Sequence, residues 1–352
     1  MHIGIAGAGL LGRLLALHLS RAGHRVDVFD PASGPGPKVE SGSEAAGWTA
    51  AGMLSPVAEL ECADARVFAW GLRSCQLWPD IVQSLGDPVA LRLQGSLLLA
   101  HRSDAGAAQR VVGLLQSKAG APYQPEPLDA ARLAELEPAV HGPALSWLLP
   151  SEGHIHTVQA MQALAYQGTA QGVQWHWHST VQTADAGVLT VQVQGESAQG
   201  ERHRFDQVFD VRGTGARPQL PVRGVRGEVF WLHAPGIVLT RSLRLMHPRH
   251  SVYIVPRPGD LVVVGASEIE SEDRSPVSLR STLELLSAAH SVLPELAEAR
   301  VVHSESNLRP ALPDNLPLIE RASGITRING LYRHGWLIAP AIVEQVLQEG
   351  FL

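Results

Sequence analysis

The sequence has few of the residues and segments that define several large classes of protein. Its 352 residues include only two cysteines, Cys62 and Cys75, too few for a disulfide framework and at a spacing that matches no zinc motif. No apolar run is both long enough and free enough of charge to span a bilayer. The net charge of −6 leaves no basic excess for nucleic acid or an anionic membrane. We therefore expect a cytoplasmic protein that binds neither.

What the chain does have is enough apolar sequence for an extensive core. Apolar residues make up 45% of its 352 positions, a length that predicts one large domain or two intertwined ones. Histidine is frequent, at sixteen residues, and two pairs alternate along the chain: His154 with His156, and His176 with His178. We find no nearby cysteine or carboxylate that completes a ligand set, so we expect no metal site.

The most informative segment is the N-terminus, where glycines separate a predicted strand from a predicted helix. The turn Gly7-Ala-Gly9-Leu-Leu-Gly12 follows an apolar strand, and a second strand ends at Asp30. In a dinucleotide-binding fingerprint the first glycine permits a tight turn, the second lets backbone approach a pyrophosphate, and the third lets helix and strand pack closely. The helix N-terminus then faces the phosphates, and the acid holds a ribose hydroxyl.

Two other interpretations of this segment are weaker. A signal peptide would begin with basic residues, whereas Arg13 instead interrupts the apolar run. An ordinary buried strand and helix would gain nothing from three glycines, which loosen both elements entropically.

Further along, helices and strands alternate and are interrupted by a block rich in strands. Helices are predicted over 62–85, 105–118, 129–137, 157–170 and 277–291 and from about 341, and strands over 91–100, 173–181, 205–211, 225–232, 241–246, 251–256, 260–266 and 299–305. A second glycine-rich turn, Gly213-Thr-Gly215, follows the strand at 205–211. This order predicts an α/β fold, α+β overall, in which a β-rich domain is threaded through a discontinuous nucleotide-binding domain.

Five motifs in order give the chain a family resemblance. They are the N-terminal fingerprint, Thr49–Pro56, Ser251–Arg257, Leu308–Asp314 and Gly330–Gly335. Together they resemble the flavin-dependent amine oxidases of the D-amino-acid oxidase superfamily, and within it the FAD-dependent glycine oxidases of thiamine (thiazole) biosynthesis. The resemblance implies a Rossmann-like FAD-binding domain made of residues 1–85, 150–215 and 305–352. It implies a substrate domain with a mixed or antiparallel sheet made of residues 86–149 and 216–304.

The resemblance assigns the cofactor contacts to several separate stretches. The adenosine and pyrophosphate of FAD would contact Gly7, Gly9, Gly12 and Asp30, and the ribityl chain and flavin ring would contact Ala50, Ala51, Gly52 and Met53. Val181 would meet the adenine through its backbone, Gly213 and Gly215 would form a second close approach, and the pyrimidine side of the flavin would face Arg333, His334, Gly335 and Trp336. Because no cysteine lies between 301 and 320, non-covalent FAD is expected.

For the substrate, the resemblance implies that Arg309 grips a carboxylate and that Tyr253 is its hydroxyl partner. A guanidinium suits this role because its planar fork can bind both carboxylate oxygens. Arg333 matches a further arginine near that carboxylate. Structural roles stay open for all three: Arg309 paired with Asp314, Tyr253 in the core, and Arg333 bonded to the flavin or a carbonyl. We expect no dedicated general base, although His334 is an alternative.

The expected reaction is oxidation of glycine or another small amino acid by hydride transfer to the flavin. It would give an imine, then glyoxylate and ammonia, with oxygen or another electron acceptor. Oxygen would yield hydrogen peroxide, and the imine would serve thiamine thiazole synthesis. D-amino-acid or sarcosine oxidases, dehydrogenases with another acceptor, and a dinucleotide-binding module without turnover are the alternatives. Departures from the family pattern at 153–157, Glu320 and 305–307 leave the substrate open, and the resemblance also allows a homo-oligomer.

Overall fold

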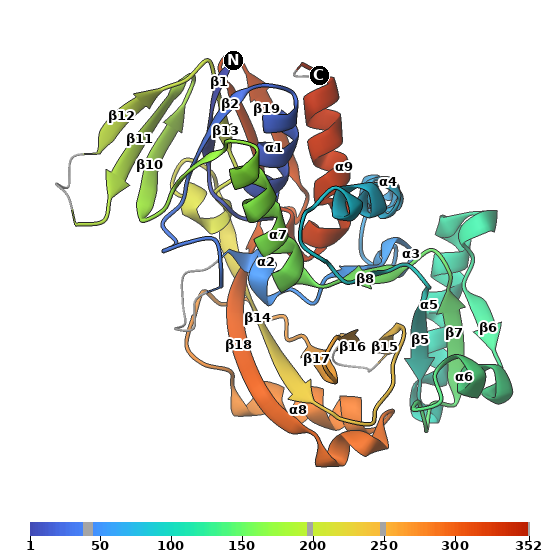
Figure 1. Ribbon diagram of the computed structural model, residues 1–352. Coiled ribbons are helices and arrows are strands. Elements are labelled where there is room, and N and C mark those ends of the chain that lie inside the picture. The colour runs from blue at the N-terminus through green and yellow to red at the C-terminus, as the bar shows by residue number, and fades with distance from the viewer. Residues whose placement is uncertain (38–44, 196–199, 247–250, 351–352) are drawn as a thin grey trace.

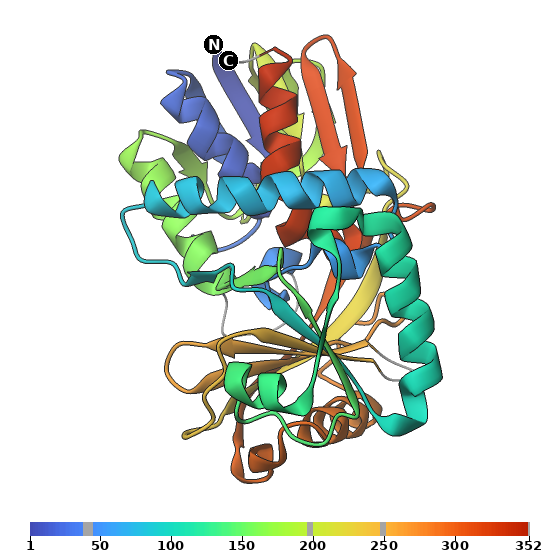
Figure 2. The ribbon, with the colours of Figure 1, turned by 90° about the vertical axis from the view of Figure 1, so that its right-hand side faces the viewer.

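In the computed structural model the chain folds around two large β-sheets, with helices packed against both of them (Figure 1). The structure describes residues 1–37, 45–195, 200–246 and 251–350. Both termini lie at the end of the molecule that holds the first of these sheets (Figures 1 and 2). Within the described ranges, no helix is long and apolar enough to cross a membrane.

The first sheet has six strands in the order β19-β20-β13-β1-β2-β9, and only β19 runs antiparallel to its neighbour. Its strands are β1 (His2–Ala6), β2 (Arg25–Phe29), β9 (Gln174–His176), β13 (Gln207–Asp210), β19 (Leu318–Ala322) and β20 (Ile325–Asn329). Successive side chains of a strand point to opposite faces. Ile3 and Ile5 accordingly pack against α1 (Leu10–Arg21), α7 (Thr157–Ala170) and α9 (Gly335–Gln348).

The opposite face of this sheet is covered by a small three-stranded sheet rather than by helices. It consists of β10 (Ser179–Asp185), β11 (Val188–Val193) and β12 (Glu201–Arg204). Ala6 and Val208 on the large sheet pack against Val181, Leu189 and Val191 of the small one. The nucleotide-type sheet is therefore buried on both faces, as parallel sheets generally are.

The second large sheet has eight strands in the order β18-β14-β17-β16-β15-β5-β7-β6, antiparallel throughout except between β15 and β5. The strands are β5 (Ser96–Ala100), β6 (Glu126–Leu128), β7 (Leu145–Leu149), β14 (Arg223–His233), β15 (Ser242–Met246), β16 (Ser251–Arg257), β17 (Leu261–Gly265) and β18 (Arg300–Ala311). Val252 and Ile254 point into a core closed by α8 (Leu279–His290). Tyr253 and Val255 point the other way, toward the segment that leads to β3.

The remaining α-helices and β-strands belong to neither large sheet. They are α2 (Ala46–Thr49), β3 (Met53–Leu54), α3 (Pro56–Glu59), α4 (Ala65–Gln83), β4 (Leu91–Arg92), α5 (Ala105–Ala119), α6 (Ala130–Leu136) and β8 (Gly153–Ile155). Strands β3, β8 and β4 form a third small sheet. The long helix α4 crosses between the two halves of the molecule and packs against α9 (Figure 2).

The predicted fold class is confirmed, because a mostly parallel sheet built from separate parts of the chain is combined with a large mixed sheet. The four strands predicted between 225 and 266 are present as β14 to β17. β18 extends beyond the predicted 299–305 to Ala311, and Pro310 is tolerated in it because this strand lies at the sheet edge. The predicted domain boundary at 305 thus falls inside a strand, and the division into domains stays a prediction.

Two predicted strands are wrong because the backbone turns inside them. The segment 91–100 is split into β4 and β5, with Gly95 at φ +86 between them. The segment 173–181 is split into β9 and β10 at His178, whose φ is +56. His176 and His178 therefore do not share one face of a single strand, as the alternation predicted.

The last helix begins at Gly335, before Pro340, and not near 341 as predicted. Proline cannot donate the hydrogen bond that an interior helical residue gives to the carbonyl four positions earlier. Here that carbonyl, on Trp336, accepts a hydrogen bond of 3.1 Å from the indole of buried Trp78 in α4. A tertiary contact therefore satisfies the group that the proline leaves without a partner.

We expect Gly12→Ala to destabilise the protein by at least about 2 kcal/mol. A Cβ at this position would lie 1.9 Å from the Gly7 carbonyl oxygen, so α1 would have to move away from β1. Gly113→Ala is the matched control, because Gly113 is exposed within α5 and a Cβ there meets nothing within 4 Å. That change should stabilise by up to about 1 kcal/mol. Thermal unfolding of both variants is the measurement, and equal shifts would contradict the packing argument.

Candidate active site

A cavity of about 770 Å³ lies between the two large sheets and is lined by residues of both. All the predicted site residues line it except Gly12, which instead lies under the fingerprint turn. The residues that it brings together are Gly7, Gly9, Asp30, Ala50, Ala51, Gly52, Met53, Val181, Gly213, Gly215, Tyr253, Arg309, Arg333, His334, Gly335 and Trp336. The cavity therefore joins positions that are up to about 330 residues apart in the sequence.

At one end of the cavity the fingerprint turn leaves helix donors uncovered. Gly7 adopts φ +104, and a Cβ there would lie 2.9 Å from the Val211 carbonyl oxygen. Helix α1 starts after Gly9 with no side-chain cap and no acidic residue in its first turn. Its first N–H groups and its positive end therefore face the cavity, an arrangement that suits a pyrophosphate.

Asp30, which directly follows β2, stabilises the turn at this end of the cavity through hydrogen bonds to the backbone. Its Oδ2 accepts a hydrogen bond of 2.6 Å from the backbone of Ala8, and its Oδ1 accepts one of 2.9 Å from Ala32. An ionised carboxylate has further lone pairs. Asp30 can therefore hold the turn and still accept a hydroxyl from a ligand in the cavity.

Arg212 fixes the second glycine-rich turn. Its guanidinium lies 2.8 Å from the buried Asp210 carboxylate and donates to the Val181 carbonyl over 2.9 Å. Gly213 follows with φ +57, and its carbonyl accepts from Asn329 over 3.0 Å. The backbone of Val181 is predicted to meet the adenine, and its carbonyl already has one partner within the protein.

The middle of the cavity is formed by the segment Ala50 to Met53. Gly52 has φ +66, and a Cβ there would lie 2.2 Å from the Ile155 carbonyl oxygen, so this backbone path requires glycine. Behind the segment, Arg257 donates a 2.5 Å hydrogen bond to the Ala51 carbonyl. Burial lowers the pKa of this guanidinium to about 9.

Two histidines adjoin this buried arginine. Burial, followed by the positive charge of Arg257, lowers the pKa of His154 to about 3 and that of His156 to about 4. Neither lines the cavity, so the sequence departure at 153–157 lies behind the cavity wall. No group of side chains in the described ranges could hold a metal ion.

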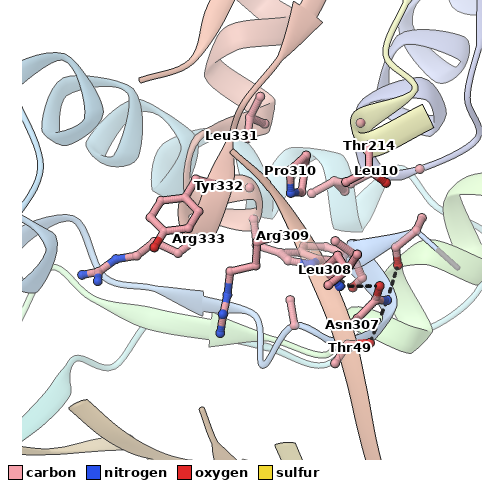
Figure 3. Close-up of a pocket in the computed structure, with 18 of the residues that line it drawn as sticks. Leu10, Thr49, Thr214, Asn307, Leu308, Arg309, Pro310, Leu331, Tyr332 and Arg333 are labelled. Carbon is pink, nitrogen blue, oxygen red and sulfur yellow. Dashed lines mark hydrogen bonds between the residues drawn. The ribbon is translucent and has the colours of Figure 1, made fainter. Parts of the chain in front are cut away.

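Arg309 points into the cavity beside Tyr332 and Arg333 (Figure 3). Tyr253 also lines the cavity. The Arg309 guanidinium donates to the Ser267 carbonyl over 3.1 Å and lies over Gly227, where a Cβ would approach it to 2.6 Å. None of the ion pairs among the described residues involves Arg309, and the Asp314 carboxylate accepts from the backbone of Leu316. Pairing with Asp314, the structural alternative, is therefore not what the structure shows.

Tyr253 reaches the cavity because it alternates with the core residues of β16. Opposite it, Gly265 leaves room for the ring, since a Cβ there would lie 2.7 Å from the Tyr253 hydroxyl. Burial raises the pKa of this hydroxyl, while Arg309, Arg244 and Arg257 oppose the shift. The hydroxyl therefore stays protonated at neutral pH and can donate a hydrogen bond.

Arg333 is held by a carboxylate that the sequence analysis did not single out. Oε2 of Glu59 accepts from Nε and Nη2 of Arg333 over 2.9 and 2.8 Å, and Oε1 accepts from Arg244 over 2.9 Å. Nδ1 of His334 lies 3.2 Å from the same Oε2. Burial alone would raise the pKa of Glu59, but Arg244, Arg333 and His334 hold it well below its usual value. Glu59 is therefore ionised throughout the physiological range.

Gly335 and Trp336 start α9 at the wall of the cavity. This helix has no side-chain cap, so its positive end also faces inward. The Trp336 indole donates to the Gly47 carbonyl over 3.0 Å, which ties α9 to α2.

Comparison with known proteins agrees with this geometry. Residues 2–348 match the model of the family DAO, described as FAD dependent oxidoreductase. The chain belongs to this family. A protein of Rhizobium etli provisionally named thiamine biosynthesis oxidoreductase ThiO is 36% identical over 349 residues, which cover 98% of this chain and 95% of that protein.

Other relatives of the oxidoreductase cover its whole length. The crystal structure of a glycine oxidase from Geobacillus kaustophilus has a TM-score of 0.80 at 25% identity and covers 99% of this chain and 94% of that one. A bifunctional ThiO/ThiG protein of Trichormus variabilis is 26% identical over 353 residues, which are 96% of this chain and 50% of that protein. The protein is thus an FAD-dependent oxidoreductase similar to glycine oxidases.

Several cavity residues of this oxidoreductase were missed from sequence. Glu59 lies three residues beyond the recognised motif Thr49–Pro56. Arg244 is a charged residue in an otherwise apolar strand, and it faces the cavity while its neighbours Leu243 and Leu245 face the core. Asn307, from the departure at 305–307, lines the cavity and donates to Thr49 over 3.1 Å (Figure 3). Glu320, by contrast, is exposed on β19. Charge at an apolar position is the one signal that could have found Arg244.

We expect the free energy of unfolding to decrease as the pH is lowered below 6.5, because of His154. Its pKa is about 3 in the folded protein and 6.5 in the unfolded chain, so below pH 6.5 the unfolded chain binds more protons. This histidine should cost about 1.4 kcal/mol per pH unit between pH 6.5 and 5. In His154→Gln that part of the pH dependence should disappear.

The effect is measured by urea unfolding at about pH 6.5 and about pH 5, with FAD in fixed excess. His303→Gln is the control, because the His303 ring is 57% exposed and its removal should leave the pH dependence as in the wild type. A His154→Gln variant with the full wild-type pH dependence would contradict the assignment.

Proposed function

We propose that this protein oxidises glycine or another small amino acid with FAD. The observation that carries the proposal is the Arg309 guanidinium, which lies in the cavity beside Tyr253 without an ion-pair partner among the described residues. A cation in such a place binds an anion of matching shape, and its fork matches a carboxylate. The names of the relatives from Geobacillus kaustophilus and Rhizobium etli support glycine as substrate and thiazole synthesis as the purpose.

The described residues fit FAD as the cofactor. The uncapped start of α1, the close approaches at Gly7 and Gly213, and Asp30 suit the nucleotide part, while Ala50–Met53 and the start of α9 suit the ring system. Neither Cys62 nor Cys75 lines the cavity, which supports non-covalent binding. When bound, FAD supplies a two-electron acceptor for a hydride from the α-carbon of the substrate.

The protein's own task is to hold and orient the amino acid. Arg309 binds the carboxylate through two charge-assisted hydrogen bonds, and the protonated Tyr253 hydroxyl donates a third. Because the carboxylate is held in one place, the α-hydrogen is directed toward the cofactor. A misplacement of the reacting atoms by about 1 Å lowers the rate about a hundredfold. Arg333 contributes indirectly, because Glu59 already holds its guanidinium.

No side chain needs to remove a proton from the α-carbon, since hydrogen leaves with its electron pair. The amine must be neutral first, and both the charge of Arg309 and the enclosed cavity favour its neutral form. His334 is not needed as a base for this step, and its Nδ1 lies 3.2 Å from the Glu59 carboxylate. The resulting imine takes up water to give glyoxylate and ammonia, with oxygen as final electron acceptor giving hydrogen peroxide.

Oxidation of D-alanine or sarcosine, with oxygen or a quinone as acceptor, is the alternative. Rates for glycine, sarcosine and D-alanine, each with and without oxygen, separate these activities. A protein that binds FAD but is reduced by none of them would be a binding module without turnover. The homo-oligomer and the division into FAD and substrate domains also stay predictions.

We expect Arg309→Ala to lose at least about a hundredfold in kcat/KM for glycine, from two charge-assisted bonds of about 1.5–3 kcal/mol each. FAD should remain bound, because the contacts proposed for its nucleotide part come from the start of α1, Gly7, Asp30 and Gly213 and not from Arg309. The measurement is anaerobic bleaching of the visible flavin absorbance by glycine. Arg300→Ala on the same strand, with a 72% exposed side chain, is the control and should bleach like the wild type. Unchanged bleaching in Arg309→Ala would remove that residue from the site.

A further inference from the structure

We propose that Glu59 restricts the cavity to substrates with a single carboxylate, because its negative charge is shared between the two guanidinium groups that line the cavity together with the substrate arginine. This inference rests on the proposed function for the role of Arg309. It adds the substrate class, monocarboxylic amino acids, and a residue that selects it.

Three of the guanidinium groups that line the cavity lie near one another, because Arg309 and Arg244 both act on the Tyr253 hydroxyl and Arg309 and Arg333 both act on the Tyr332 hydroxyl. Without compensation they would form an attractive site for two carboxylates. The family resemblance places both Arg309 and Arg333 near one substrate carboxylate.

Glu59 changes this balance because it takes both neighbouring arginines as partners. One oxygen binds Arg244 at 2.9 Å and the other binds Arg333 at 2.8 Å, so both of its oxygens are engaged. Glu268 adds a second, weaker contact to Arg333 at 3.4 Å. Of these three guanidinium groups, Arg309 is the one that has neither carboxylate as a partner.

Burial makes the compensation by Glu59 strong. The Glu59 side chain is 12% exposed and that of Arg244 is 9% exposed, so water screens their interaction little. The Glu268 side chain, by contrast, is 50% exposed. A second carboxylate entering this part of the cavity would have to displace Glu59 from its partners or lie against its negative charge. Rejection by an unfavourable charge is an established way to obtain specificity.

The test compares the binding of acetate and malonate to the FAD-loaded protein by titration calorimetry. These ligands differ by one carboxylate and neither carries an oxidisable amine. In the wild type, malonate should bind no more tightly than acetate. In Glu59→Gln, the preference for malonate over acetate should rise at least tenfold, because Arg244 and Arg333 lose their partner. An unchanged preference in a folded, FAD-loaded Glu59→Gln variant overturns the proposal.

Two further variants separate charge from other effects. Glu270→Gln removes a carboxylate that pairs with Arg223 outside the cavity, and it should keep the wild-type preference. Glu59→Gln combined with Arg333→Gln restores the net charge of the cavity, and its preference should return to within threefold of the wild type. A double variant that keeps the full preference of Glu59→Gln would overturn the charge argument.

Removing Glu59 leaves two cations without their buried partner and can prevent folding. In that case Arg333→Gln carries the test. It leaves Glu59 with one guanidinium instead of two, so the cavity becomes more negative and malonate should weaken at least threefold relative to acetate. An equal change for both ligands overturns the proposal.

Oxidation rates distinguish this proposal from the proposed function. The ratio of kcat/KM for iminodiacetate to that for glycine should rise at least tenfold in Glu59→Gln. Retained glycine oxidation with an unchanged ratio overturns the role of Glu59 alone. Absence of flavin reduction by every amino acid in the wild type overturns the proposed function, while the calorimetric preference still tests Glu59.

Discussion

The buried carboxylate of Glu59 is the interaction on which the geometry of this cavity depends. It lies at the end of α3, between the two large sheets, and binds Arg244 from the eight-stranded sheet and Arg333 from the segment before α9. Breaking a buried pair by removing one partner generally costs about 3–5 kcal/mol. The same three side chains therefore join the two halves of the molecule and set the charge of the space between them.

A second constraint is close approach of backbone to backbone. Gly12 allows α1 to lie against the turn at Gly7, and Gly52 allows the central segment to lie against the carbonyl of Ile155. In each case a Cβ would occupy the space of a carbonyl oxygen. The result is two long backbone surfaces along the cavity, with the positive ends of α1 and α9 directed into it. Such surfaces bind a large planar and phosphorylated cofactor without needing many charged side chains.

The part of the cavity that we propose binds the substrate is shaped by strand alternation and by the position of β18 at the edge of its sheet. Tyr253 reaches the cavity because its neighbours Val252 and Ile254 point into the core under α8. Arg309 lies on β18, the edge strand, where Pro310 leaves no unsatisfied partner in the ladder. In this family the cofactor supplies the redox chemistry. The protein's own contribution is to select the substrate and to orient it.

The sequence by itself determined the features whose physics is local. The glycine spacing from Gly7 to Gly12 and the apolar alternation between 225 and 266 depend on neighbouring residues, and the structure has both. Family motifs likewise indicated 16 of the residues that line the cavity. Tertiary structure alone decided the partners of buried charges, since Glu59 meets an arginine 185 residues away and another 274 residues away. It also decided where α9 begins, because an indole from α4 satisfies the carbonyl freed by Pro340. Such pairings depend on which surfaces meet, and no local pattern encodes that.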